Sequence, residues 1–190
     1  MLYELVQKNR SYRRFYQNER IDDETLRQLI ELARFSASTS NLQPLRFCIV
    51  NDPEKNDEVF GTLKWAGYYK DWDGPEEGER PSAYIVILRD KNVSVRIGYD
   101  EGIAAQSMML GAAEKGLGGC MVGSIDVSKL REILNIDDGL SIQLVLALGR
   151  PKEKAVAQTV KNGESIKYWR DNDGVQHVPK RAAQDIIVGL

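Results

Sequence analysis

The chain has 190 residues, a length that predicts a single domain over residues 1–190. Its hydrophobic and charged fractions, 42% and 28%, are typical of an ordinary soluble globular protein. The formal net charge of −2 argues against a nucleic-acid partner, and no apolar run approaches the ~20 residues that span a bilayer.

Thiol and imidazole groups are few. Cys48 and Cys120 lie far apart in apolar surroundings, so we interpret them as buried free thiols and not as a disulfide. The single histidine, His177, leaves no basis for a histidine-rich metal site, and the N-terminal residues lack the apolar region of a signal peptide. These features predict a cytoplasmic protein without a bound metal.

The chain begins with two predicted helices and a basic turn between them. Apolar spacing predicts a short helix over Leu2–Lys8 and an amphipathic helix over Asp22–Ala37, which opens on a capping aspartate. Between them, the run Asn9–Phe15 holds three arginines within five residues. This run is either a solvated turn or a clamp for an anion such as phosphate, because guanidinium groups match phosphate oxygens in a bidentate way.

A polar stretch, Ser36–Pro44, connects the second helix to a predicted strand over Leu45–Val50. It holds four hydroxyls, two amides and a proline in nine residues. Such short polar side chains compete for backbone hydrogen bonds, so they end helices and line loops. The stretch is therefore either a simple helix-to-strand connection or a polar edge for a ligand rich in oxygens and amide-like groups.

The segment Trp65–Arg80 differs in character from its surroundings. Before it, Asp52 and Pro53 predict a helix that continues to about Trp65. The segment itself crowds four aromatic rings into eight residues and continues into a run rich in glycine, proline and charge. It is either a surface loop with anchoring rings or a mobile lid over a flat ligand, with these rings as the substrate contacts: Trp65, Tyr68, Tyr69 and Trp72.

The middle of the chain is apolar. Ala83–Leu88 predicts a central strand, and Asp100–Leu117 predicts a helix that is apolar almost all round. That helix either runs through the middle of the monomer or forms half of a subunit interface. The glycine-rich run Gly116–Ile125 follows a helix and does not open one, so it is not a dinucleotide-binding loop, but its backbone can approach a ligand closely.

The C-terminal third holds shorter elements. Asp126 predicts the start of a short helix over Val127–Leu134, and Ser141–Gly149 predicts a third strand. The turn Asp171–Gly174 predicts a β-hairpin. The apolar end of residues 179–190 predicts that the tail docks on a surface.

Four of these segments, in this order, resemble the motifs of the nitroreductase family of flavin mononucleotide (FMN)-dependent oxidoreductases. Arg10–Arg13 is similar to the family's Arg-Ser-x-Arg, and Ser38–Pro44 to its Ser-x-x-Asn-x-Gln-Pro. The apolar helix with Gly116–Ser124 after it resembles the central helix and flavin-edge loop, and Lys180-Arg181 the basic pair of the phosphate site. Asn9 stands where many members carry a further arginine.

The resemblance implies an α+β fold with a central, mainly antiparallel sheet flanked by helices. It also implies an interlocked homodimer with FMN at the dimer interface. The apolar helix would then pack on its mate, and the tail over residues 179–190 would extend across the partner. The polar stretch would face a flavin that is held mainly by the other chain.

The resemblance further implies that the chemistry occurs on flavin N5 and that no side chain acts as the catalytic nucleophile. NAD(P)H would donate a hydride, and a small flat acceptor such as a nitroaromatic or quinone would receive the electrons. Arg13 would face the N1–O2 edge of the flavin, and backbone of Val122–Ser124 would face O4 and N5. The implied cofactor-binding residues are Arg10, Ser11, Arg13, Ala37, Ser38, Thr39, Asn41, Gln43, Met121, Val122, Gly123, Ser124, Lys180 and Arg181.

Three alternatives on the same scaffold stay open at this point. A flavin-dependent dehalogenase would use an acidic and aromatic lid such as Trp65–Arg80 to grip its substrate. A flavin-fragmenting enzyme and a non-catalytic flavin-binding dimer are the other two. The motifs do not name the acceptor or choose NADH over NADPH.

Overall fold

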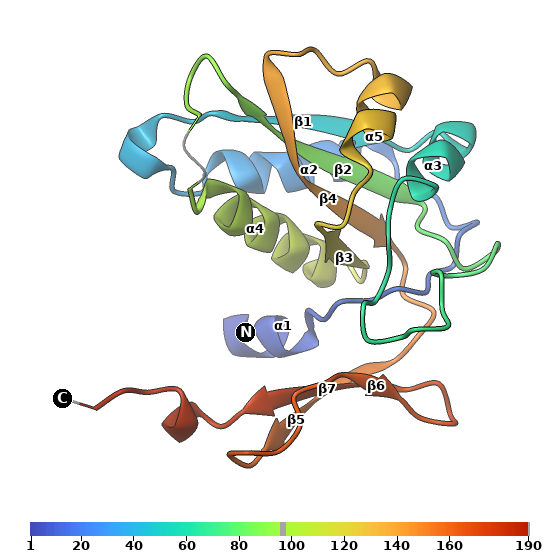
Figure 1. The fold of residues 1–190 in the computed structure, drawn as a ribbon, viewed down its shortest axis with the longest axis vertical. Coiled ribbons are helices and arrows are strands. Elements are labelled where there is room, and N and C mark those ends of the chain that lie inside the picture. The colour runs from blue at the N-terminus through green and yellow to red at the C-terminus, as the bar shows by residue number, and fades with distance from the viewer. Residues whose placement is uncertain (96–97, 190) are drawn as a thin grey trace.

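The protein folds around a four-stranded antiparallel sheet with helices on both faces (Figure 1). This architecture, seen in a computed structural model that describes residues 1–95 and 98–189, confirms the expected α+β class. The strand order is β1-β2-β4-β3, so the long strands lie at the centre. The strands are β1 (Leu45–Val50), β2 (Ala83–Asp90), β3 (Gly118–Val122) and β4 (Leu140–Gly149).

Two apolar layers cover the two faces of the sheet. Successive side chains of a strand point to opposite faces, so Ile85 and Ile87 of β2 join one layer while Tyr84 and Val86 join the other. Helices α2 and α4 supply the first layer, and α3 and α5 the second. The helices are α1 (Leu2–Lys8), α2 (Asp23–Arg34), α3 (Pro53–Phe60), α4 (Asp100–Glu114) and α5 (Val127–Leu134), with short 3-10 turns η1 (Thr39–Asn41) and η2 (Ala183–Asp185).

The predicted helix starts are confirmed because their signals are local. Asp22, Asp52 and Asp126 each accept a hydrogen bond from the backbone N–H three residues ahead. The predicted end of α3 was wrong: the helix stops at Phe60, where the amide of the capping Gly61 bonds back to the helix. Helix α4 likewise ends at Glu114, before the predicted Leu117.

Helix α4 is buried along most of its length within the chain. Gly111 lies under α2, where a Cβ atom would stand 2.2 Å from a methyl carbon of Leu32. Ile103, near the N-terminal end of α4, stays 40% exposed. Other parts of the same chain therefore cover most of the apolar surface of α4. This burial agrees with a helix that runs through the middle of the monomer, the first of the two alternatives.

The glycine-rich run contains a strand that the sequence did not predict. Gly118–Val122 forms β3 at the edge of the sheet and pairs with β4. A Cβ atom on Gly119 would lie 2.5 Å from the carbonyl oxygen of Ala147, and one on Gly118 would lie 2.5 Å from the Tyr12 ring. Close packing against both neighbours explains why these positions are glycine. Because β3 extends to Val122, the loop expected here begins only after that residue.

A second sheet lies apart from the first, on the far side of α1 (Figure 1). Its order is β5-β7-β6, with β5 (Ala155–Val160), β6 (Trp169–Arg170) and β7 (Gln176–Arg181). Strands β6 and β7 are antiparallel across the turn Asp171–Gly174, which confirms the predicted hairpin, whereas β5 was not predicted. Beyond β7 the chain runs away from the body, and the side chains of Ile187 and Val188 are 69% and 92% exposed.

Within the described residues, no helix is both long and apolar enough to cross a membrane.

Candidate functional site

The basic turn after α1 is fixed against strand β3. The backbone N–H of Tyr12 donates to the carbonyl of Gly119 at 2.9 Å, and Ser11 forms an isolated bridge with the same glycine. The backbone N–H groups of Arg13 and Arg14 donate to one carboxylate oxygen of Glu153, whose side chain is only 3% exposed. These contacts hold the arginine-rich run in one place beside the end of the sheet.

Arg13 and the end of β3 line one small cavity of about 160 Å³, with walls that come from four segments. The Arg13 guanidinium lies 4.7 Å from the centre of the Tyr168 ring. Its Nε atom is buried and has no hydrogen-bond partner in the described part of the chain. The other lining residues are Lys64, Trp65, Ala66, Gly67 and the run from Cys120 to Ser124.

The backbone after β3 presents unused donors to this cavity. The amides of Gly123 and Ser124 donate to no backbone atom within residues 1–95 and 98–189. A Cβ atom added to Gly123 would meet nothing within 4 Å, so open space lies beside it. The carbonyl of Ser124 accepts from the backbone N–H of Lys64 at 3.0 Å, which fixes the loop. The cavity thus combines a cation with free amide donors, a donor set that fits an anionic, oxygen-rich group.

Cys120 borders this cavity but offers no reactive thiolate. Burial raises the pKa of its thiol, and the nearby Arg13 guanidinium lowers it by less. Burial also raises the pKa of the Cys48 thiol. Both cysteines are free, as predicted, but only Cys120 is buried, whereas Cys48 is half-buried. Both favour the protonated form.

The polar stretch folds around the buried carboxylate of Asp100, which is 3% exposed at the start of α4. Asp100 accepts hydrogen bonds from the Ser38 hydroxyl at 2.6 Å, the Thr39 hydroxyl at 3.0 Å and the Thr39 backbone N–H at 3.2 Å. The Ser38 hydroxyl also accepts from the Gln43 backbone N–H at 2.9 Å. Burial by itself raises the pKa of Asp100, but the hydrogen bonds from Ser38 and Thr39 lower it by more. The pKa of Asp100 therefore lies below its ordinary value.

The turn held by Asp100 has a strained backbone. Ser40, Asn41 and Gln43 have φ values of 51°, 55° and 52°, in the left-handed region that residues other than glycine seldom adopt. A turn that keeps three such residues has to be stabilised from outside. The contacts to Asp100 supply that stabilisation and leave Ser40, Asn41 and Gln43 exposed.

The two predicted halves of the site lie at opposite ends of helix α4 (Figure 1). Asp100, at its first residue, holds the polar stretch, while β3 and the bound basic turn follow its last turn. Fifteen residues of helix are about 22 Å long. One chain therefore does not bring Ser38–Gln43 to Arg13.

The predicted basic pair does not line the Arg13 cavity. Lys180 and Arg181 are exposed at the end of β7, in the second sheet. Arg10 itself donates to the carbonyl of Val6 at 2.6 Å.

The four predicted substrate rings have different surroundings. Trp65 is 7% exposed and packs under Gly74, where a Cβ atom would stand 2.6 Å from its ring. Tyr69 donates through its hydroxyl to the buried Gln176 side chain at 2.7 Å, and Trp72 meets the Tyr69 ring edge-on at 5.9 Å. Tyr68 is 50% exposed. The segment is thus anchored by three of its rings and shows the fourth to solvent.

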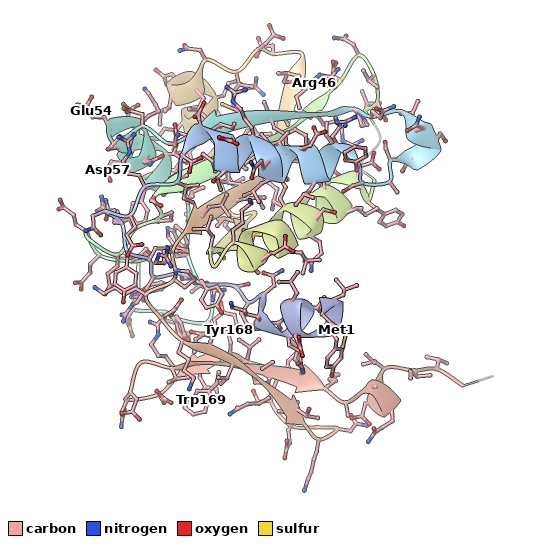
Figure 2. All side chains as sticks on the ribbon, turned by 180° about the vertical axis from the view of Figure 1, so that it is seen from behind. Met1, Arg46, Glu54, Asp57, Tyr168 and Trp169 are labelled. Atoms are coloured by element: carbon pink, nitrogen blue, oxygen red, sulfur yellow. The ribbon has the colours of Figure 1, made fainter. Side chains whose placement is uncertain are left out.

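The C-terminal hairpin brings further rings that the sequence did not single out. Tyr168 packs on Tyr68 with ring centres 4.8 Å apart, and Trp169 stacks on His177 at 4.1 Å. Figure 2 labels Tyr168 on the side of the second sheet that faces the body and Trp169 below it. Arg170 pairs with the buried Glu153 at 2.7 Å. The aromatic and basic run from 167 to 170 was the signal that could have revealed them.

Comparison with known proteins identifies the family. The profile of the nitroreductase family matches residues 6–77 and 78–150, so the chain belongs to this family. The expected class of enzyme, an FMN-dependent NAD(P)H oxidoreductase, is confirmed at the level of the family.

Individual relatives are distant but match most of the chain. An iodotyrosine deiodinase from Thermotoga neapolitana is 26% identical over 170 residues, which cover 80% of this chain and 90% of that protein. A putative NADH dehydrogenase/NAD(P)H nitroreductase from Archaeoglobus fulgidus is 25% identical, covering 74% and 80%. The structure of an FMN-dependent nitroreductase from Clostridium difficile matches with a TM-score of 0.68 and 22% identity, covering 97% and 96%. This last likeness supports the fold.

Proposed function

We propose that the protein is an FMN-dependent oxidoreductase that passes a hydride from NAD(P)H to a flat acceptor such as a nitroaromatic or a quinone. The single observation that carries the proposal is the cavity in which Arg13 meets the unused amides of Gly123 and Ser124. Family membership supports it, because the class of enzyme is shared.

The residues at this cavity fit FMN. The Nε atom of Arg13, which lines the cavity, and that of Arg10, which does not, are buried and have no partner among the described residues. Arginines with such unused donors fit an anionic cofactor. The open space beside Gly123 lets a flat ring approach the backbone closely. FMN, when bound, supplies the hydride chemistry.

The chain's own groups would bind and tune this cofactor. Arg13 would place a positive charge at the N1–O2 edge, where reduction adds negative charge. Arg10, Ser11, Lys180 and Arg181 would hold the phosphate, and the Gly123 and Ser124 amides would donate to the O4–N5 edge.

The polar stretch would complete the site from a second chain. Asn41 and Gln43 would reach the flavin held by the partner, because α4 keeps them away from Arg13 of their own chain. The exposed apolar tail, including Ile187 and Val188, supports a homodimer because these side chains have little cover within one chain.

The test begins with purified protein. We expect a yellow homodimer that releases FMN on denaturation and consumes NAD(P)H when a nitroaromatic or quinone is added. The variant Arg13→Ala should bind FMN more weakly, whereas Arg27→Ala, on the exposed face of α2, should bind it normally. A colourless monomer that ignores added FMN would refute the proposal.

A dehalogenase is the second candidate, because the Thermotoga neapolitana relative is named an iodotyrosine deiodinase. The acidic and aromatic segment Trp65–Arg80 supports it. Iodide release from iodotyrosine, measured beside NAD(P)H oxidation with a nitroaromatic, distinguishes the two reactions.

The segment Trp65–Arg80 is proposed as a wall of the acceptor site. Trp72→Ala should raise the acceptor KM several-fold with unchanged FMN content, since one aromatic pair contributes about 0.5–1.5 kcal/mol. If the variant loses thermal stability while its acceptor KM is unaltered, the ring serves only to anchor the segment.

A further inference from the structure

An open hollow of about 810 Å³ lies between the segment 68–72 and the C-terminal hairpin. We call it the aromatic hollow, because rings from both segments line it. The rings of Tyr68 and Tyr168 pack at its wall with centres 4.8 Å apart and planes tilted by 47°. Tyr68 and Trp169 are 50% and 47% exposed. Exposed ring faces of this kind can stack on a flat molecule.

The charges around the aromatic hollow are mostly positive. Lys70, Lys167 and Arg170 line it, against one acidic residue, Asp71. The charge of Arg170 is matched by Glu153, to which it donates at 2.7 Å. Neither lysine ammonium pairs with a carboxylate among the residues that the structure describes, and the Lys167 ammonium lies 5.9 Å from the centre of the Tyr68 ring. Two cations without an ion pair among the described residues therefore line the hollow, and one of them, Lys167, lies close to a ring.

The aromatic hollow adjoins the cavity proposed for the flavin. Tyr168 lines both, and the Arg13 guanidinium lies 4.7 Å from the centre of its ring. A molecule stacked in the hollow would thus be one ring away from the Arg13 cavity.

We propose that the aromatic hollow binds the acidic end of the electron acceptor, a flat aromatic compound whose reducible end extends past Tyr168 into the Arg13 cavity, because hydride transfer needs direct contact with the flavin. Its ring stacks on Tyr68 and Trp169, and its anion pairs with Lys70 and Lys167. This inference rests on the proposed function and adds the class of substrate. None of Lys70, Lys167 or Trp169 belongs to the residues predicted from the motifs.

Matched acceptors test the proposal. 4-Nitrobenzoate and 4-nitrobenzamide share the ring and the reducible group and differ in charge. In each case NAD(P)H and one proton deliver two electrons and two protons, so the nitro group becomes a nitroso group and one water leaves, with NAD(P)⁺ as the oxidised product. We expect the holoenzyme to show a higher kcat/KM for the anion, and 0.5 M salt should reduce that preference because ion pairs are screened.

Lysine variants assign the preference to the hollow. Lys167→Gln and Lys70→Gln should each lower kcat/KM for 4-nitrobenzoate about fivefold, the upper range for a partly exposed ion pair, and leave 4-nitrobenzamide unchanged. Lys129→Gln removes the same charge from α5 and should change neither. Calorimetric titration of the oxidised holoenzyme with 4-hydroxybenzoate and 4-hydroxybenzamide gives a readout that needs no turnover, and we expect only the benzoate to lose affinity in the two variants.

The outcomes separate this inference from the proposed function. Equal turnover of both acceptors, or equal losses for both in the lysine variants, overturns the inference while the oxidoreductase stands. A change in the KM for NAD(P)H with no change for 4-nitrobenzoate overturns it also, because the hollow would then bind the donor. If no acceptor is reduced, even a neutral quinone, the proposed function fails, and equal calorimetric affinities would then reject the hollow as an anion site.

Discussion

Replacing Asp100 with asparagine tests whether one buried carboxylate holds the polar turn in its strained shape. The substitution keeps the side-chain volume but removes the negative charge of the group that accepts three hydrogen bonds from Ser38 and Thr39. Hydrogen bonds to a charged group contribute about 1.5–3 kcal/mol, against about 0.5–1.5 for neutral pairs. Three bonds thus lose about 3 kcal/mol in total, and the lower cost of burying a neutral amide returns part of it. We expect a net loss of about 1–2 kcal/mol.

That loss is comparable with the strain in the turn. Each of Ser40, Asn41 and Gln43 has φ above 50°, a conformation that costs roughly 1–2 kcal/mol for an L-residue. Losing part of the support should therefore open the turn locally before the protein unfolds. Amide hydrogen exchange over residues 38–43 should become faster in Asp100→Asn, and FMN affinity should fall about tenfold, the equivalent of about 1.4 kcal/mol.

The pH dependence follows from the pKa of Asp100, which the bonds from Ser38 and Thr39 leave below its ordinary value despite burial. A carboxyl group whose folded pKa is depressed stabilises the fold fully above its unfolded pKa, about 3.9. That stabilisation is lost as the pH falls through the folded pKa. The difference in melting temperature between the wild type and Asp100→Asn should therefore shrink as the pH is lowered below about 4.

Asp22 offers a matched control. It accepts from the backbone N–H and the hydroxyl of Thr25, as Asp100 does from Thr39, but it caps a helix at the surface. Asparagine caps helices about as well as aspartate, so Asp22→Asn should leave exchange over residues 38–43 unchanged. If Asp100→Asn exchanges and binds FMN like the wild type, the carboxylate does not hold the turn.

Three further predictions concern other parts of the molecule. Arg13→Ala should lower the midpoint potential of bound flavin by about 30–65 mV, because one charge-assisted hydrogen bond contributes about 1.5–3 kcal/mol and two electrons are transferred. Dye equilibration measures this potential, and an unchanged value would assign Arg13 a structural role. Gly74→Ala should destabilise the fold by about 2–4 kcal/mol in denaturant, because φ is +125° and the new methyl would meet Trp65, whereas Gly163→Ala adds strain without a clash. Hydrogen bonds from His177 and Val175 lower the pKa of Asp171, so Asp171→Asn should speed hydrogen exchange in the β6–β7 hairpin at pH 7, and the difference should vanish as the pH falls below the folded pKa.

Local signals made much of the fold predictable. The capping aspartates, the apolar spacing of α2 and the apolar runs of β1, β2 and β4 each depend on residues within one short window. The hairpin turn Asp171–Gly174 is also local. Strand β3 was not predictable, because its glycines are required by close packing against Tyr12 and Ala147, which lie elsewhere in the chain.

The candidate site was less predictable because its contacts join distant residues. Glu153 meets Arg13 across 140 residues, and Asp100 meets Ser38 across 62. The motifs predicted Arg13, Ser38 and Ser124 as site residues, which stays a prediction. No motif pointed to Glu153 or Asp100, because a buried carboxylate is recognised by the donors that surround it in space.

The length of α4 has a genetic consequence in the proposed homodimer. Each flavin would take Arg13 from one chain and Asn41 from the other, since these residues lie at opposite ends of the helix. Chains carrying Arg13→Ala and chains carrying Asn41→Ala would each be defective alone. Expressed together, they would form mixed dimers in which one site carries both defects and the other carries neither. Two defective alleles of this gene would then complement each other, whereas two alleles altered at the same end of α4 would not.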